Sequence, residues 1–254
     1  MTTIDLNCDL GEGCGSDAEL MRYISSANIA CGFHAGDGDT MRRTVELALE
    51  QGVAIGAHPG YADPENFGRT QMKLAPAEVR QLIFDQLDAL KRVCDPLGAK
   101  IGHIKPHGAL YNQAAKDREL ASAVVEAVTE WDRDLIFYGL SGSEMIAEAQ
   151  KVGLRTASEV FADRTYQSDG SLTPRTESNA LITETETSAT QVLDMIRYGR
   201  VRSTDAIMVA IKCETICLHG DGDHAVEFAS LIRERLEADG VNIENPECLS
   251  TQRR

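Results

Sequence analysis

The sequence predicts an α/β protein with one (β/α) barrel domain, residues 1–254, closed by seven strands. A short apolar run, a polar loop and an amphipathic helix recur along the whole chain. In addition, a polar side chain follows nearly every predicted strand. An open sheet would gather such groups at one switch point, whereas a closed barrel lets many strand ends converge on one site. The strand-end residues are Asp9, His34, His58, Lys105, Glu159 and His219.

Apolar runs of strand length predict the strands. Six of them span residues 4–8, 27–31, 53–57, 101–104, 135–140 and 156–161. Two further runs, 207–211 and 215–218, predict a hairpin or a bent strand that ends at His219.

Amphipathic helices are expected between these strands. The first covers about residues 40–51, with Asp39 as its predicted N-cap and Gly52 as its left-handed C-terminal stop. Pro76 opens the next helix, because proline fits the first helical turn. Apolar residues at helical spacing predict later helices near 120–128, 145–146, 192–196 and 226–236.

The net charge is 25 − 40 = −15, and the isoelectric point is about 4.8. This balance argues against a surface that binds nucleic acid or anionic membrane, but it allows a small anionic substrate held by buried cations. The N-terminal residues are acidic where a signal peptide is basic and then apolar. The seven cysteines form no CxxC pair, which favours free thiols and a cytoplasmic protein.

Carboxylates follow the first two predicted strands. Asp9 and Glu12 come after the first strand and Asp37 after the second. Three acids near a barrel mouth can bind a metal, orient a water or act as a general acid and base. Asp residues also cap turns in Gly-rich loops, and for Asp37 this interpretation is equally strong.

Histidines gather at the same positions. Five of the six histidines lie in or beside strand-end loops, which predicts one shared pocket: His34, His58, His107, His219 and His224. Imidazole suits proton transfer near neutral pH and also Zn²⁺ ligation. The local spacing of the histidines does not by itself assign a metal ligand.

Cations and missing motifs narrow the chemistry. Lys105 is expected to neutralise a substrate carboxylate or a developing oxyanion. Arg69 and Arg164 can clamp a carboxylate or phosphate, although surface ion pairing explains each of them equally well. No GxxxxGK[ST] loop, strand-placed GxGxxG or GxSxG elbow is present. Cys8 and Cys31 lie in apolar runs and are expected to be small core residues.

Several strand-end stretches together resemble the LamB/YcsF family, which includes the A subunit of bacterial ATP-dependent 5-oxoprolinase. They cover the chain in order: DLNCDLGEG (5–13), SANIACGFHAGD (26–37), GAHPGY (56–61), FGR (67–69), KPHGALYN (105–112), SEVFADRTY (158–166) and ICLHGD (216–221). The resemblance implies a seven-stranded barrel related to the glycoside hydrolase/deacetylase fold. It also implies ATP-driven cleavage of the lactam of 5-oxo-L-proline to L-glutamate, together with subunits B and C.

Under this resemblance each strand-end residue has an expected role. The chain has no nucleotide-binding motif, so ATP would be bound largely by the partner subunits, and a divalent metal is left open. The residues expected to act in catalysis are Asp9, His58, Lys105, His107 and His219. The residues expected to bind substrate are Glu12, Asn28, His34, Arg69, Glu159, Arg164 and Asp221.

Two other functions fit the same residues. In a deacetylase-like amide hydrolase, the histidines and aspartates would ligate a metal that ionises water, without ATP. Stoichiometric metal in protein purified without added metal would favour this function. A non-catalytic subunit would only present the lactam to its partners, and unchanged turnover after strand-end mutation would favour that.

Overall fold

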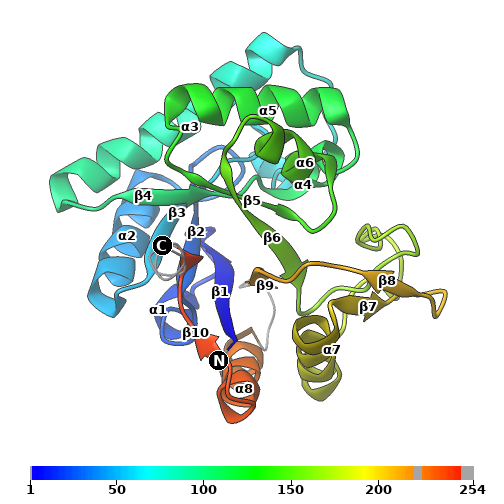
Figure 1. Cartoon of the computed structure of the whole chain (residues 1–254). Helices are drawn as coiled ribbons and strands as arrows, with labels where there is room; N and C mark the ends of the chain where they lie inside the picture. The colour runs from blue at the N-terminus through cyan, green and yellow to red at the C-terminus, as the bar shows by residue number, and fades with distance from the viewer. Residues whose placement is uncertain (1, 220–224, 247–254) are drawn as a thin grey trace.

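The computed structural model describes residues 2–219 and 225–246, and its centre is a closed barrel of parallel strands (Figure 1). Neighbouring barrel strands pair in chain order, and the last pairs with the first, from Asp5↔Thr215 to Asp9↔His219. The barrel strands are β1 (Thr3–Leu10), β2 (Ser26–Ala30), β3 (Ala54–His58), β4 (Ile101–Ile104), β5 (Ile136–Leu140), β6 (Arg155–Phe161) and β9 (Thr215–His219). The predicted seven-stranded barrel is confirmed.

Helices lie around the outside of the barrel (Figure 1). Their buried faces carry the apolar residues whose spacing predicted them, such as Val79, Ile83, Leu87 and Leu90 on one helix. The helices are α1 (Asp17–Leu20), α2 (Gly38–Gln51), α3 (Pro76–Leu97), α4 (Gly108–Ala114), α5 (Arg118–Trp131), α6 (Glu144–Lys151), α7 (Thr185–Tyr198) and α8 (Ala225–Ala238), with a 3₁₀ turn at Pro64–Asn66. No helix of the described segments combines the length and the apolar character that crossing a membrane requires.

The predicted hairpin of runs 207–211 and 215–218 is wrong. Strand β8 (Met208–Ala210) pairs antiparallel with β7 (Arg200–Arg202), in a small ribbon beside α7 (Figure 1). Only β9 enters the barrel, where it fills the gap between β6 and β1. The side chain of Met208 is 48% exposed, so this apolar run is a surface ribbon and not a core strand.

The predicted N-cap of α2 is also wrong by two residues. The helix begins at Gly38, and the Asp37 side chain accepts a hydrogen bond from the Thr40 backbone N–H at 2.8 Å. Asp39 therefore lies in the first turn, and the capping interpretation of Asp37 is confirmed. Gly52, with φ 68°, ends the helix as predicted.

Alternate residues of a strand point to the same face, and those that point into the barrel are largely polar. On β1 these are Asp5, Asn7 and Asp9, all buried. At the closed end of the barrel, Asp5 accepts hydrogen bonds from Ser26 Oγ (2.7 Å) and Tyr138 Oη (2.9 Å). At the other end, Asp9 faces the loops that follow the strands, and the functional site begins there.

Two further elements escaped the sequence analysis. The short strand β10 (Asn242–Ile243) extends the sheet beside the N-terminal end of β1, in register with Thr3 and Ile4. Gly56 on β3 leaves room for the His103 ring inside the barrel, because a Cβ there would lie 2.0 Å from His103 Nε2. Both features depend on neighbours that are distant in sequence.

Candidate active site at the barrel mouth

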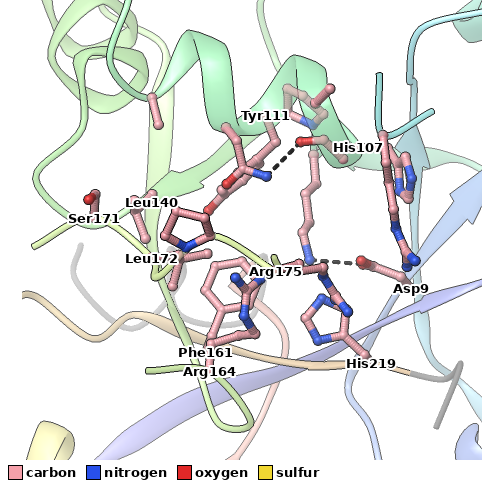
Figure 2. A pocket seen from close by; sticks show the side chains of 18 of the residues that line it. Asp9, His107, Tyr111, Leu140, Phe161, Arg164, Ser171, Leu172, Arg175 and His219 are labelled. Atoms are coloured by element: carbon pink, nitrogen blue, oxygen red, sulfur yellow. Dashed lines mark hydrogen bonds and ion pairs between the residues drawn. The ribbon is translucent and has the colours of Figure 1, made fainter. Parts of the chain in front are cut away.

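A cavity of about 620 Å³ opens at the carboxyl ends of the strands. Asp9 of β1, His58 of β3, Phe161 of β6 and His219 of β9 line it, together with loops after β4 and β6. Figure 2 shows His107 and Tyr111 across the cavity from His219. This is the edge at which barrel enzymes place their reacting groups.

Lys105 lies at the floor of this cavity and is only 2% exposed. Its Nζ is 2.8 Å from Asp9 Oδ1 and 2.9 Å from Glu159 Oε1. It also donates to Asn7 Oδ1 (3.3 Å) and Cys217 Sγ (3.0 Å). An ammonium has three N–H donors, so the protein itself occupies all of them.

Charge pairing keeps these buried groups ionised. Burial alone would lower the pKa of Lys105, but the negative groups around it, Asp9 first and then Cys217 and Glu159, together outweigh burial and hold that pKa well above its ordinary value. Burial likewise opposes ionisation of Asp9. Attraction to a protonated His58 and to Lys105 overcomes it, so the pKa of Asp9 lies well below its usual range. The site therefore carries a buried carboxylate that stays charged in mild acid.

Asn28 and Tyr111 complete this network from two sides. Asn28 Nδ2 donates to Asp9 Oδ1 at 2.8 Å and to Asn7 Oδ1 at 2.7 Å. The Tyr111 hydroxyl donates to Glu159 Oε2 at 2.7 Å. Both carboxylates are thus oriented by neutral donors as well as by the ammonium, which limits their movement.

Two histidines face each other beside Asp9. His58 Nδ1 donates to the Lys105 backbone carbonyl at 2.7 Å, and His107 Nε2 donates to the Phe67 carbonyl at 2.9 Å. Their other nitrogens, His58 Nε2 and His107 Nδ1, lie 2.9 Å apart. Asp9 Oδ2 is 3.2 Å from His58 Nε2.

Glu12 and His34 join this pair from the loops after β1 and β2. Glu12 Oε1 lies 3.3 Å from His107 Nδ1 and 3.3 Å from His34 Nε2. The His34 ring stacks on His107 with centroids 3.8 Å apart and planes 5° apart. Burial lowers the pKa of His34 to about 3 and holds the pKa of His107 well below its usual value, which favours neutral rings.

Three arginines line the cavity, Arg69 beside Phe67 on the histidine side and the other two in the loop after β6. Arg69, Arg164 and Arg175 all contribute to its wall. The Arg164 guanidinium is buried and donates to the backbone carbonyls of Thr173 (2.5 Å) and Ala180 (3.3 Å), so it also holds the loop after β6. In a chain of net charge −15, these three arginines, here called the arginine rim, gather positive charge at one cavity.

Comparisons with known proteins identify the family of this chain. The model of the LamB/YcsF family matches residues 4–251. This chain belongs to the LamB/YcsF family. It is 53% identical to a protein of Geobacillus kaustophilus (strain HTA426) named as the A subunit of 5-oxoprolinase, over 250 residues, 97% of this chain and 98% of the relative. It is 49% identical to the protein of the same name from Bacillus subtilis (strain 168), with 96% of each chain covered.

Solved structures show the same architecture. A lactam utilization protein from Thermus thermophilus superposes with a TM-score of 0.89 at 40% identity, covering 96% of this chain and 99% of that one. The peptidoglycan deacetylase PdaC from Bacillus subtilis reaches a TM-score of 0.54 at 12% identity, covering 98% and 90%. The second likeness concerns the fold alone, and it places this LamB/YcsF protein with the deacetylase-like barrels.

The structure gathers most of the residues that the sequence analysis selected in this LamB/YcsF chain. Asn28 and Glu159 lie directly beneath the cavity, and His34 packs behind His107. Asp221 and His224 lie outside the described residues. The selected residues on the cavity wall are Asp9, Glu12, His58, Arg69, Lys105, His107, Arg164 and His219.

Sequence reasoning missed Asn7, Cys217, Tyr111 and Arg175. Asn7 and Cys217 lie two residues before Asp9 and His219, on the same strand faces, so the period of two could have identified them. Arg175 comes from a polar loop with no local signal. Its place at the site depends on how that loop folds across the barrel mouth.

Two groups of side chains at the site have a composition that could hold a metal ion. In the first, ligand atoms of Glu12, His34, His58 and His107 lie within 4.8 Å of one another. The second consists of Asp9, Cys217 and His219. The Lys105 ammonium bonds to both Asp9 and Cys217, so this second group already encloses a cation.

Proposed function

We propose that this chain is the A subunit of a 5-oxoprolinase, which cleaves the lactam of 5-oxo-L-proline to L-glutamate with ATP hydrolysis and with subunits B and C. The naming of relatives at about half identity supports this proposal. The observation that carries it is the buried ammonium of Lys105, held between two carboxylates beside paired histidines on a cavity floor. A cytoplasmic location, expected from the sequence, is part of the same proposal.

The chemistry explains why ATP is needed. A lactam carbonyl is a weak electrophile, and nitrogen is a poor leaving group. Transfer of the terminal phosphoryl group of ATP to the carbonyl oxygen breaks its bond to ADP and activates the ring carbon. Water can then attack that carbon, and the ring C–N bond breaks as the nitrogen takes a proton. The opened chain is then an acyl phosphate, which a second water hydrolyses, so glutamate, ADP and phosphate are the products.

The residues divide between these tasks. Asp9, kept ionised by Lys105, or His58 beside it accepts the proton of the attacking water. Of the two cavity histidines expected to protonate the leaving nitrogen, His107 has both ring nitrogens engaged by His58 and Phe67, so His219 on the opposite side takes this role. Because the donors of Lys105 are occupied within the protein, the arginine rim is the better partner for the substrate carboxylate.

The size of the cavity supports a role for partners. About 620 Å³ lies within the range of pockets that hold drug-sized ligands, and it exceeds what a five-membered lactam acid fills. The remaining space can admit a phosphoryl group or residues of a partner subunit. ATP itself would then be bound largely by subunits B and C.

Glutamate release from 5-oxoproline tests the proposal. The chain is assayed alone and with candidate B and C partners, each with and without ATP. We expect turnover only with partners and ATP, and its loss in Asp9→Asn. The control Asp85→Asn, on the exposed side of α3, should retain wild-type turnover.

The other outcomes separate the competing functions. Turnover without ATP would replace the proposal with the deacetylase-like hydrolase. Lactam binding with unchanged turnover in Asp9→Asn would reduce the chain to a presenting subunit. No glutamate from any mixture of folded proteins would refute the proposed reaction.

A further inference from the structure

The hydrogen bonds of His58 and His107 determine which of their ring nitrogens carry hydrogen. A carbonyl oxygen only accepts, so His58 Nδ1 and His107 Nε2 must both carry hydrogen to donate to the Lys105 and Phe67 carbonyls. In neutral rings, the two nitrogens that face each other at 2.9 Å then both present lone pairs. Two lone pairs at this distance repel unless a proton or a metal ion lies between them.

Backbone acceptors behind both rings are a common feature of metal sites. A metal-bound histidine usually donates its other N–H to a carbonyl or carboxylate, which fixes the tautomer and aims the free nitrogen. Here both rings are anchored in this way, although His58 belongs to β3 and His107 follows β4. The same two nitrogens are therefore aimed at one point by separate parts of the barrel.

Two carboxylates supply negative charge at the same point. Asp9 Oδ1 already accepts from Lys105 and Asn28, so Oδ2 is the atom that approaches His58 Nε2, at 3.2 Å. Glu12 Oε1 lies 3.3 Å from His107 Nδ1 and 3.9 Å from His58 Nε2. Ligands about 2.0–2.1 Å from a tetrahedral ion lie about 3.3 Å from one another, and the distances here, 2.9–3.9 Å, bracket that value.

We propose that His58 Nε2, His107 Nδ1, Glu12 Oε1 and Asp9 Oδ2 bind one divalent ion of the zinc class. Two imidazoles with two carboxylates favour such a borderline ion over Mg²⁺ or Ca²⁺, which prefer oxygen ligands alone. All four residues line the cavity, so the ion faces the space that a substrate would enter. In a chain that carries the ion, Asp9 and His58 are ligands; the base role proposed for them above applies to the chain without it.

His34 is excluded from the ligand set by its orientation. An imidazole nitrogen binds a metal in the plane of its ring. The His34 and His107 planes are parallel and stacked at 3.8 Å, so they cannot both aim a lone pair at one ion. His34 is a positioning residue, which holds the His107 ring by stacking.

Metal binding to the full chain tests this assignment. Apo-protein, prepared by dialysis against a chelator, is titrated with Co²⁺, followed by its visible absorption, and then with Zn²⁺, counted by elemental analysis. We expect one ion per chain. Glu12→Gln and His107→Gln should each weaken metal binding by more than about 100-fold, which is the most that changes outside the ligand set cause. His34→Gln should still bind one ion, with an affinity at most about 10-fold lower.

His219→Gln is the matched control, because it removes another cavity histidine that is not in the ligand set. Thermal unfolding shows whether each variant folds. If His107→Gln does not fold, the metal affinity of Glu12→Gln tests the ligand set. Wild-type protein that binds neither ion in stoichiometric amount would overturn the proposal. So would equal losses in His34→Gln and Glu12→Gln, or loss of the ion in His219→Gln.

These measurements need neither lactam nor partner subunits. A bound ion without glutamate release would overturn the proposed reaction and leave the metal site standing. Glutamate release by a chain that binds no ion would do the reverse.

Discussion

Replacement of Lys105 by Met tests whether its ammonium holds the site together electrostatically. The substitution keeps most of the side-chain volume but removes the charge between Asp9 and Glu159, both buried. Removing one partner of a buried ion pair typically destabilises a protein by about 3–5 kcal/mol, because the other charge is left uncompensated. For a chain of this size, about 2 °C per kcal/mol gives a fall of about 6–10 °C in Tm.

The destabilisation by Lys105→Met should depend on pH, and the pKa of Asp9 gives the direction of this dependence. In the wild type, the pKa of Asp9 lies well below its ordinary value of about 4, so its contribution to stability is complete above that value and is lost only in stronger acid. Without Lys105, burial and the nearby Glu159 carboxylate raise the pKa of Asp9. The destabilisation should therefore be larger at pH 7 than at pH 5, where Asp9 takes up a proton.

Thermal and denaturant unfolding at both pH values measure these effects. Lys91→Met is the matched control, since Lys91 pairs with Asp95 at 2.6 Å but its side chain is 51% exposed. An exposed pair contributes at most about 1 kcal/mol. Adding Asp9→Asn to Lys105→Met should restore part of the lost stability. If Lys105→Met unfolds no more easily than Lys91→Met, the electrostatic argument is refuted.

Three other predictions concern the frame of the site. Gly56→Ala should destabilise by about 1–3 kcal/mol in denaturant unfolding, because its Cβ would overlap the His103 ring, whereas Gly38→Ala, with open space around it, should not destabilise. Burial lowers the pKa of His103 to about 3, so the free energy of unfolding should fall as the pH drops from 6.5 toward 3, by up to about 1.4 kcal/mol per pH unit. His103→Gln should remove this contribution to the pH dependence, measured by denaturant unfolding at pH 7, 5 and 4. Asp37→Ala should lower the unfolding free energy by about 1 kcal/mol and Asp39→Ala hardly at all, and equal losses would contradict the observed cap.

The fold was predictable because its signals are local. The barrel strands lie in short stretches rich in apolar residues. Single residues mark where some helices begin or end, as Pro76 and Gly52 do. The run 207–211 failed for the same reason. Its composition resembles that of a core strand, but β9 occupies the place between β6 and β1. No local pattern indicates which of the two runs enters the barrel.

The site was predictable in membership and not in arrangement. Strand-end position placed Asp9, His58 and Lys105 in one pocket, because parallel strands of a barrel end at the same mouth. Nothing in the local sequence indicated that Lys105 would be fully buried, or that its donors would be occupied by residues of β1, β6 and β9.

By itself, the sequence determined the barrel, its family and most of the side chains at its mouth, since these follow from short local motifs and patterns. Only the tertiary structure decided which atoms meet. It aimed His58 and His107 at each other through backbone carbonyls on separate segments, and it enclosed Lys105 between Asp9 and Glu159. Directional hydrogen bonds and unscreened charges act only at contact distance, and closing the barrel is what creates those contacts.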